Sequence, residues 1–497
     1  MAVGAEGVLC GAVDGVRTGD SVYSITNAPP GPPLVACPRV GELAEPDKSE
    51  VSRWRRVAAL YYPRVSGVDS LAHLLDAAEA AAPVDAVSAV TREIGKRLRA
   101  SSVSFLVADT SGRALVRLVH VSLGPLEPAP GSSTPAAGHR REGEESARVL
   151  PFDGGPMERV VRHQRLEALP PERRAGREDW TVLAPVTERG EVIGVLELRL
   201  PEEPDKDDTA EIASLAHLLA FVVIANRRHT DLFEWGHRSR PLSLSAEIQQ
   251  RLLPGPRTCE AGAFTLSGWL EPAADIAGDT FDYSLERDTL HLSMTDAMGH
   301  GVAAALTATL CVSALRGSRR RAASLTEQAH SANAAVAQHA NGGGLDDFVT
   351  GLVGRVDLNT GVLHLVNAGH VTPYLARDGE VSAIALPTNL PFGIFGDSTY
   401  QAVDLHLRPG DRVVFVTDGM LERNAANIDL PTSIRESLSL HPREAATALA
   451  DGVLEATGHA LSDDATILCL DWYGGHGQDR STAAGADVMR ASSPTTR

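Results

Sequence analysis

The residues of this sequence whose types and spacing could do chemistry are aspartates that stand beside glycines and threonines. They fall in four motifs of the C-terminal half: Ala-Gly-Asp-Thr-Phe-Asp (277–282), Thr-Asp-Ala-Met-Gly-His-Gly (295–301), Thr-Asp-Gly (417–419) and Ser-Asp-Asp-Ala-Thr (462–466). A glycine lets backbone or ligand approach the carboxylate, and converging carboxylates make an oxygen-rich site for hard divalent cations. No Cys or His cluster offers softer ligands, so Mn²⁺ or Mg²⁺ is favoured over zinc. The motifs therefore indicate a metal-dependent hydrolase.

Each motif lies where we expect a strand to begin or end. Asp296 ends an apolar strand and precedes a helix, Asp418 follows the apolar run 413–416, and Asp463 and Asp464 precede the strand 466–470. Buried carboxylates without partners are costly. Packing alone is therefore a poor explanation for carboxylates at three strand edges.

The elements that must position these aspartates occupy residues 258–473. Alternating and apolar runs predict strands at 264–269, 290–295, 348–357, 362–367, 412–417 and 465–472. Helical periodicity predicts helices at 302–315, 325–340 and 442–456. Mostly antiparallel strands with helices grouped between them predict an α+β layered sandwich.

The chain of 497 residues is long enough for a second domain besides residues 258–473. We expect an irregular leader at 1–50, a helical lead-in at 51–83, a helical connector at 228–257 and a disordered tail at 474–497. Residues 84–227 combine helices with strands at 102–109, 115–121, 181–185 and 192–200, the last two joined by a hairpin turn. This order resembles a GAF sensor domain, which implies small-molecule sensing or dimerisation.

The composition of the chain excludes some classes of binding partner. The formal net charge is −18, from 46 basic and 64 acidic residues, so we expect neither a nucleic acid nor an anionic membrane as partner. The longest apolar run, 218–225, is far shorter than the roughly 20 residues that span a bilayer. The five scattered cysteines form no Cys-x-x-Cys pair, which favours reduced thiols. A soluble, cytoplasmic protein is expected.

The order and spacing of the acidic motifs resemble the SpoIIE-like bacterial branch of the metal-dependent protein phosphatases (PPM, type 2C-like). The resemblance extends to Ile-Gln-Gln-Arg-Leu-Leu-Pro (248–254), Asn-Ala-Gly-His (367–370), Leu-Pro-Phe-Gly (390–393) and Arg-Pro-Gly-Asp (408–411). It implies an αββα sandwich that holds two Mn²⁺ or Mg²⁺ ions. Those ions activate a water, so no side chain serves as nucleophile.

Carried over position by position, the resemblance implies a role for each residue of the site. Asp296 bridges the two ions, Asp279 and the backbone carbonyl of Ala297 serve the first ion, and Asp418 and Asp463 hold the second. Supporting positions around the ions are open to Asp282, Asp464 and His300, although a structural role at a helix start suits His300 better. His370 is expected to be a turn residue.

The resemblance also implies a function. It is that of a phosphoserine/phosphothreonine protein phosphatase acting on a STAS-type anti-anti-sigma factor under control of the GAF-like domain. The rival is a catalytically silent pseudophosphatase that senses a ligand and docks a partner. Pairing of the connector in a homodimer, the ligand of the GAF-like domain and the metal used in the cell are left open by the sequence.

Overall fold

The structure is a computed structural model. It describes residues 66–492 apart from 110–111, 124–148, 175–176, 237–242, 274–277, 341–346, 388, 422–428, 459–460, 476–479, 481 and 484. The chain divides into a short unit, 1–67, and a long unit, 68–497. The predicted leader 1–50 lies outside the described residues, and the lead-in is described only from helix α2 (Ser66–Ala80) onward.

The N-terminal part of the long unit is built on a six-stranded antiparallel sheet in the order β3-β2-β1-β6-β5-β4. Helices α3 and α5 pack on this sheet and on each other through one apolar core. The elements are α3 Ala86–Arg97, β1 Ser102–Ala108, β2 Ala114–Ser122, β3 Val149–Pro151, α4 Pro156–His163, β4 Glu167–Arg174, β5 Arg177–Glu188, β6 Glu191–Leu200 and α5 Lys206–Arg227.

The strands expected in this part are confirmed, including the tight turn between β5 and β6. Arg189 and Gly190 at that turn both adopt positive φ, 46° and 78°. Strand β4 was not predicted because Pro170 and Pro171 argue against a strand; the sheet accommodates them because β4 is an edge strand with a bulge there. The GAF resemblance of residues 84–227 stays a prediction.

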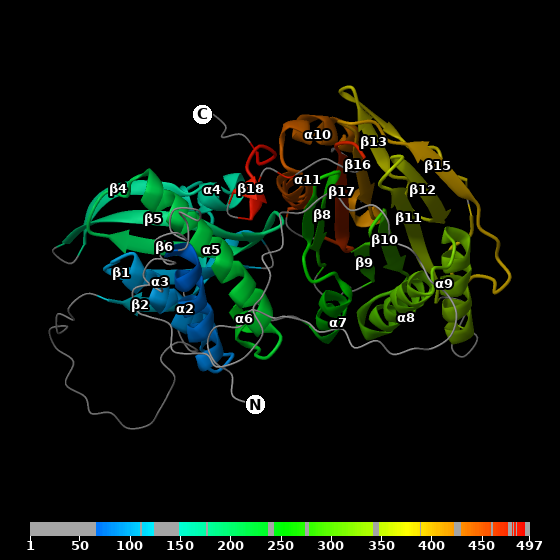
Figure 1. The fold of residues 1–497 in the computed structure, drawn as a ribbon. Helices are drawn as coiled ribbons and strands as arrows, with labels where there is room; N and C mark the ends of the chain where they lie inside the picture. The colour runs from blue at the N-terminus through cyan, green and yellow to red at the C-terminus, as the bar shows by residue number, and fades with distance from the viewer. Residues whose placement is uncertain are drawn as a thin grey trace, which may run out of the picture. The chain divides into compact units, whose positions relative to one another are not determined.

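The C-terminal part is an αββα sandwich, as predicted. One antiparallel sheet has the order β15-β12-β11-β10-β9 and the other β14-β13-β16-β17-β8-β7. Helices α8 and α9 lie side by side on the first sheet, and α11 packs on the second (Figure 1). The apolar faces of the two sheets form a shared core with Phe264, Phe281 and Phe415 at its centre.

The predicted elements of the sandwich agree closely with those observed, and several short strands are additional. The elements are β7 Thr258–Ala261, β8 Phe264–Glu271, β9 Asp279–Leu285, β10 Thr289–Ala297, α8 Gly301–Arg320, α9 Leu325–Ala340, β11 Val349–Asp357, β12 Val362–Ala368, β13 Tyr374–Arg377, β14 Glu380–Ala383, β15 Ala402–His406, β16 Arg412–Val416, the 3₁₀ turn η1 Asp418–Leu421, α10 Leu430–Glu436, η3 Ser437–Ser439, α11 Pro442–Ala456 and β17 Ala465–Trp472.

Two helices, α5 and α8, are long and apolar enough to cross a membrane by length and composition. Both contribute to protein cores instead: α5 through Ile212 and Leu219, and α8 through Ala308 and Cys311. Packing within the two domains therefore explains part of their apolar composition.

The connector contains two short helices, α6 (Leu232–Gly236) and α7 (Leu244–Leu252). Helix α7 begins where the Ser243 hydroxyl accepts a hydrogen bond from the Ala246 backbone N–H. It packs against α8 and β9. The connector therefore ends in a helix that belongs to the sandwich.

The prediction of a disordered tail is wrong for its described residues. Strands β18 (Thr482–Ala483) and β19 (Ala486–Asp487) form a small hairpin. The buried carboxylate of Glu260 accepts hydrogen bonds from the Arg480 guanidinium and the Asp487 backbone N–H, at 2.6 and 2.9 Å. The Gly-, Ser- and Ala-rich composition gave no sign of this anchor, because the partner lies more than 200 residues away in sequence.

The anchor is electrostatic. Burial raises the pKa of Glu260, but hydrogen bonds from His441 and Arg480 outweigh burial and hold the pKa at about 2. A depressed folded-state pKa stabilises the fold above the ordinary value of 4.5, and this contribution is lost as the pH falls toward 2.

Ending the chain at Gly475 should therefore destabilise the protein at pH 7 by about 2 kcal/mol, because Glu260 loses two donors while staying buried. The measurement is urea unfolding of the full and shortened chains. Glu260→Gln in the shortened chain should recover part of the loss, and Met489→Ala, at an exposed tail position, should change nothing. Equal stability of the two chains would contradict the anchor.

Candidate functional site

Asp279 and Asp296 lie opposite each other on neighbouring strands, β9 and β10. The Asp279 side chain is buried, and its Oδ2 accepts hydrogen bonds from the hydroxyls of Thr417 and Thr466, at 2.7 and 2.6 Å. Thr417 directly follows β16, and Thr466 lies in β17; both strands belong to the other sheet. One carboxylate thus joins the two sheets of the sandwich.

The other motifs reach the same place from the second sheet. Asp418 opens the 3₁₀ turn after β16, and Asp463 and Asp464 precede β17. The Asp463 carboxylate accepts a hydrogen bond from the Asp464 N–H at 2.8 Å. A Cβ at Gly419 would lie 2.0 Å from the Asp464 carbonyl oxygen, so only glycine lets these two segments approach.

The four motifs therefore crowd negative charge into one region. Burial, followed by the charges of Asp418 and Asp463, raises the pKa of Asp296 to about 7. Burial and the charges of Asp296 and Asp464 raise the pKa of Asp279 well above its ordinary value. Such mutual repulsion is relieved by protons or by a cation.

Ala297 is the last residue of β10, and its backbone lies against Gly278, which precedes β9. Its N–H donates to the Gly278 carbonyl at 3.2 Å, and a Cβ at Gly278 would lie 2.4 Å from the Ala297 carbonyl oxygen. The glycine before Asp279 is therefore required for the approach of the two chain segments.

Asp464 supports the site from within the protein. Its side chain is buried, Oδ1 accepts from the Ala273 N–H at 2.8 Å and Oδ2 accepts from Gln249 Nε2 at 2.5 Å. Burial raises its pKa to about 6, and these two hydrogen bonds oppose the rise. With both oxygens engaged by protein donors, Asp464 holds the arrangement in place.

Asp282 does not belong to the cluster, so the role considered for it near the metals is wrong. Arg316 donates to both of its carboxylate oxygens, at 3.1 and 2.8 Å, and Arg319 donates to one at 3.0 Å. Both arginines lie at the end of α8. Asp282 lies three residues after Asp279 on a strand, and odd spacing puts the two side chains on opposite faces.

The two histidines near the motifs have structural positions. His300 is exposed at the N-cap of α8, where its side chain makes no capping hydrogen bond. His370 is buried in a turn closed by Asn367, and its Nδ1 lies 2.7 Å from the Thr350 hydroxyl. Burial lowers the pKa of His370 to about 4, so it is neutral at pH 7.

Three residues that position the cluster were not assigned a role from the sequence: Gln249, Thr417 and Thr466. Gln249 Nε2 also donates to the Asp279 carbonyl oxygen at 2.9 Å. Both threonines stand inside the acidic motifs, and Gln249 lies in the Ile-Gln-Gln-Arg motif of α7. Those motif positions were the available signal, but the hydrogen bonds are visible only in the fold.

The residues fit a hard divalent cation by charge and donor type. Within the described part of the chain, no three Asp, Glu, His or Cys side chains form a ready-made coordination group. The buried Gln249 Oε1 has no hydrogen-bond partner among the described residues, and it lies beside carboxylates whose charges repel. Oxygen donors with excess negative charge suit Mn²⁺ or Mg²⁺.

The raised pKa values predict the pH dependence of the metal-free protein. A carboxyl whose folded-state pKa is raised binds more protons folded than unfolded, so stability falls as the pH rises from 3.8 to about 7. In EDTA at pH 8, Asp296→Asn should be more stable than wild type by roughly 2 kcal/mol because one repelling charge is gone. Thermal melts between pH 5 and 8 measure this.

Mn²⁺ should stabilise wild type at pH 8 and stabilise Asp296→Asn much less. Asp404→Asn, at an exposed site in β15, should respond to Mn²⁺ as wild type does. Identical pH and Mn²⁺ responses of wild type and Asp296→Asn would contradict the assignment of Asp296.

A family model described as Stage II sporulation protein E (SpoIIE) matches residues 286–473. Phosphoserine phosphatase RsbU of Bacillus subtilis (strain 168) is 23% identical over 235 residues, which cover 46% of this chain and 69% of RsbU. Phosphoserine phosphatase RsbP of the same organism is 22% identical over 247 residues, which cover 47% of this chain and 58% of RsbP.

A solved structure of the RsbU and RsbW domains of Rv1364c from Mycobacterium tuberculosis is similar at 24% identity and a TM-score of 0.38, covering 43% of this chain and 62% of that chain. The sequence matches, rather than this likeness, support the assignment. Residues 84–227 lie outside the family match. The C-terminal domain of this chain is thus similar, over residues 286–473, to the SpoIIE-like branch of the PPM phosphatases.

Proposed function

We propose that this protein is a metal-dependent phosphoserine/phosphothreonine protein phosphatase. The observation that carries the proposal is the cluster of aspartates from both sheets, in which burial and then the neighbouring negative charges raise the pKa values of Asp279 and Asp296. The RsbU and RsbP relatives, both named phosphoserine phosphatases, support the same reaction.

In this proposal two Mn²⁺ or Mg²⁺ ions are held by oxygen atoms of the cluster: the carboxylates of Asp279, Asp296, Asp418 and Asp463 and the carbonyl of Ala297. When bound, such ions supply water activation and neutralise phosphoryl oxygens. The protein's own part is to fix its oxygens in place before substrate arrives. No side chain is assigned as a nucleophile, so no phosphoenzyme is expected.

Two threonines and a glutamine do the fixing. Thr417 and Thr466 donate to one oxygen of Asp279, which leaves its other oxygen for a cation. Gln249 donates to Asp464 and to the Asp279 carbonyl. Each donor locks a carboxylate that would otherwise turn away from its negatively charged neighbours.

A protein substrate is supported by an apolar surface beside the cluster. Met298 is exposed in the turn that follows Asp296, and the exposed side chains of Val302, Leu306 and Leu310 recur every four residues along one face of α8. Apolar side chains gathered on one face mark protein interaction sites. We propose a STAS-type anti-anti-sigma factor as the substrate and control by the GAF-like domain, on the basis of the family.

Turnover of p-nitrophenyl phosphate and of a phosphoserine protein tests the activity. Wild type should hydrolyse both with Mn²⁺ or Mg²⁺ and neither with EDTA, and Asp296→Asn should lose at least about 100-fold because the cluster loses a central oxyanion. Asp404→Asn serves as the matched control and should keep wild-type rates.

The pseudophosphatase alternative makes the opposite prediction. A folded wild-type protein that turns over neither substrate with either metal, yet keeps partner function in Asp296→Ala, would establish a docking module in place of an enzyme. Turnover that persists in EDTA would exclude the metal site as its source.

A further inference from the structure

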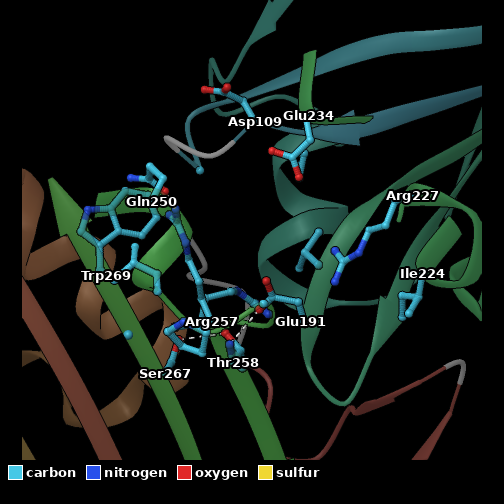
Figure 2. A pocket seen from close by; sticks show the side chains of 18 of the residues that line it. Asp109, Glu191, Ile224, Arg227, Glu234, Gln250, Arg257, Thr258, Ser267 and Trp269 are labelled. Atoms are coloured by element: carbon cyan, nitrogen blue, oxygen red, sulfur yellow. Dashed lines mark hydrogen bonds between the residues drawn. The ribbon is translucent and has the colours of Figure 1, made fainter. Parts of the chain in front are cut away.

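A cavity of about 760 Å³ lies at the joint between the N-terminal domain and the sandwich, away from the aspartate cluster. Its walls come from β1, β6, the end of α5, α6, the α7–β7 connection and β8 (Figure 2). This volume is within the range of roughly 300–1,000 Å³ that small-molecule sites occupy. The GAF resemblance left small-molecule sensing and dimerisation open for residues 84–227, whereas this cavity is lined by residues of both domains.

The walls are held together by polar contacts across the joint. Arg113 bonds to Glu271 of β8 and Asp451 of α11, at 2.9 and 2.7 Å. The Arg443 guanidinium donates to the Gly190 carbonyl at 2.8 Å, and the Thr258 N–H donates to Glu191 at 2.8 Å. These contacts give the cavity defined walls.

The lining combines apolar side chains with the cation of Arg227. Arg227, at the end of α5, extends toward the cavity in Figure 2 and has no ion-pair or hydrogen-bond partner among the described residues. By contrast, Arg257 is attracted to Glu191, and Asp109 and Glu234 already interact within the protein. The apolar part of the lining includes Phe152, Val161, Val192, Ile224, Leu253 and Trp269.

Helix α7 lies between this cavity and the aspartates. Gln250 lines the cavity and accepts a hydrogen bond from Arg257 at 2.6 Å. Its neighbour Gln249 donates to Asp464 and to the Asp279 carbonyl. A shift of α7 that adapts Gln250 to an occupant therefore moves Gln249 against the carboxylates.

We propose that the cavity binds a small organic anion with an aromatic body, its charge on Arg227 and its rings against the apolar wall. Occupancy then acts through α7 on the aspartate cluster. Binding of the anion in the cavity is independent of the proposed phosphatase function. Its effect on the aspartate cluster rests on that proposed function.

Anilinonaphthalenesulfonate, an aromatic anion that fluoresces in apolar surroundings, is a suitable probe. The full-length chain should bind it saturably at one site. Arg227→Gln should weaken binding about 10-fold, the loss of one charge-assisted hydrogen bond, and Ile224→Trp should weaken it as well by narrowing the cavity at its apolar wall. Arg92→Gln, an exposed arginine on α3, should bind as wild type does.

Absence of saturable binding, or equal affinities in wild type and Arg227→Gln, would overturn the site. Circular dichroism checks that each variant is folded, and Arg227→Gln decides the matter by itself if Ile224→Trp is not. The effect on the cluster is measured by calorimetric titration of Mn²⁺ into the full chain with and without saturating probe.

The Mn²⁺ dissociation constant of wild type should change at least about threefold in the presence of the probe, and that of Arg227→Gln should change less at a probe concentration that only just saturates wild type, because the variant is then only partly occupied. An unchanged constant in wild type would overturn the coupling through α7. If Mn²⁺ fails to bind at all, the proposed function fails, and the probe affinities still decide the cavity.

Discussion

The repulsion among carboxylates held between two sheets is the constraint on which the rest of this structure depends. Asp279 is buried, yet its neighbours are Asp296 and Asp464 and its near donors are neutral hydroxyls. The fold accepts an electrostatic cost at this point that hydrophobic packing around Phe281 and Phe415 must offset. Cost concentrated in one cluster is typical of functional sites.

The same constraint explains the surroundings of the cluster. Gly278 and Gly419 stand where a Cβ would meet a backbone carbonyl oxygen at 2.4 and 2.0 Å, so glycine allows the strand ends to converge. Gln249 of α7 donates a hydrogen bond to Asp464 of the cluster, and the neighbouring Gln250 lines the cavity at the joint with the N-terminal domain. The cluster is thus a point at which both sheets and the connector meet.

Helices and strands with a local periodicity were predicted from the sequence. Elements that depend on contacts with residues distant in sequence were not. Helices α9 and α11 begin and end at the predicted residues because their apolar spacing and flanking breakers are explicit. Strand β4 was not predicted because its prolines are tolerated only at a sheet edge. The tail hairpin was not predicted because it depends on a contact with Glu260. Propensity carries no information about either context.

The site divides in the same way. The motifs identified the aspartates, and the fold brings those of both sheets together. Asp282 shares a motif with Asp279 but faces Arg316 and Arg319, because strand alternation separates residues three apart. Gln249 could not be assigned in advance, since its partners are 30 and 215 residues away. The metal ligands themselves stay a prediction.

The most direct test of the account is anomalous diffraction from crystals of the full chain grown with Mn²⁺. The account predicts two anomalous peaks at the aspartate cluster, with Asp296 between them and Asp279, Asp418 and Asp463 around them. No peak at the cluster, in crystals that contain Mn²⁺ and an ordered sandwich, would contradict it.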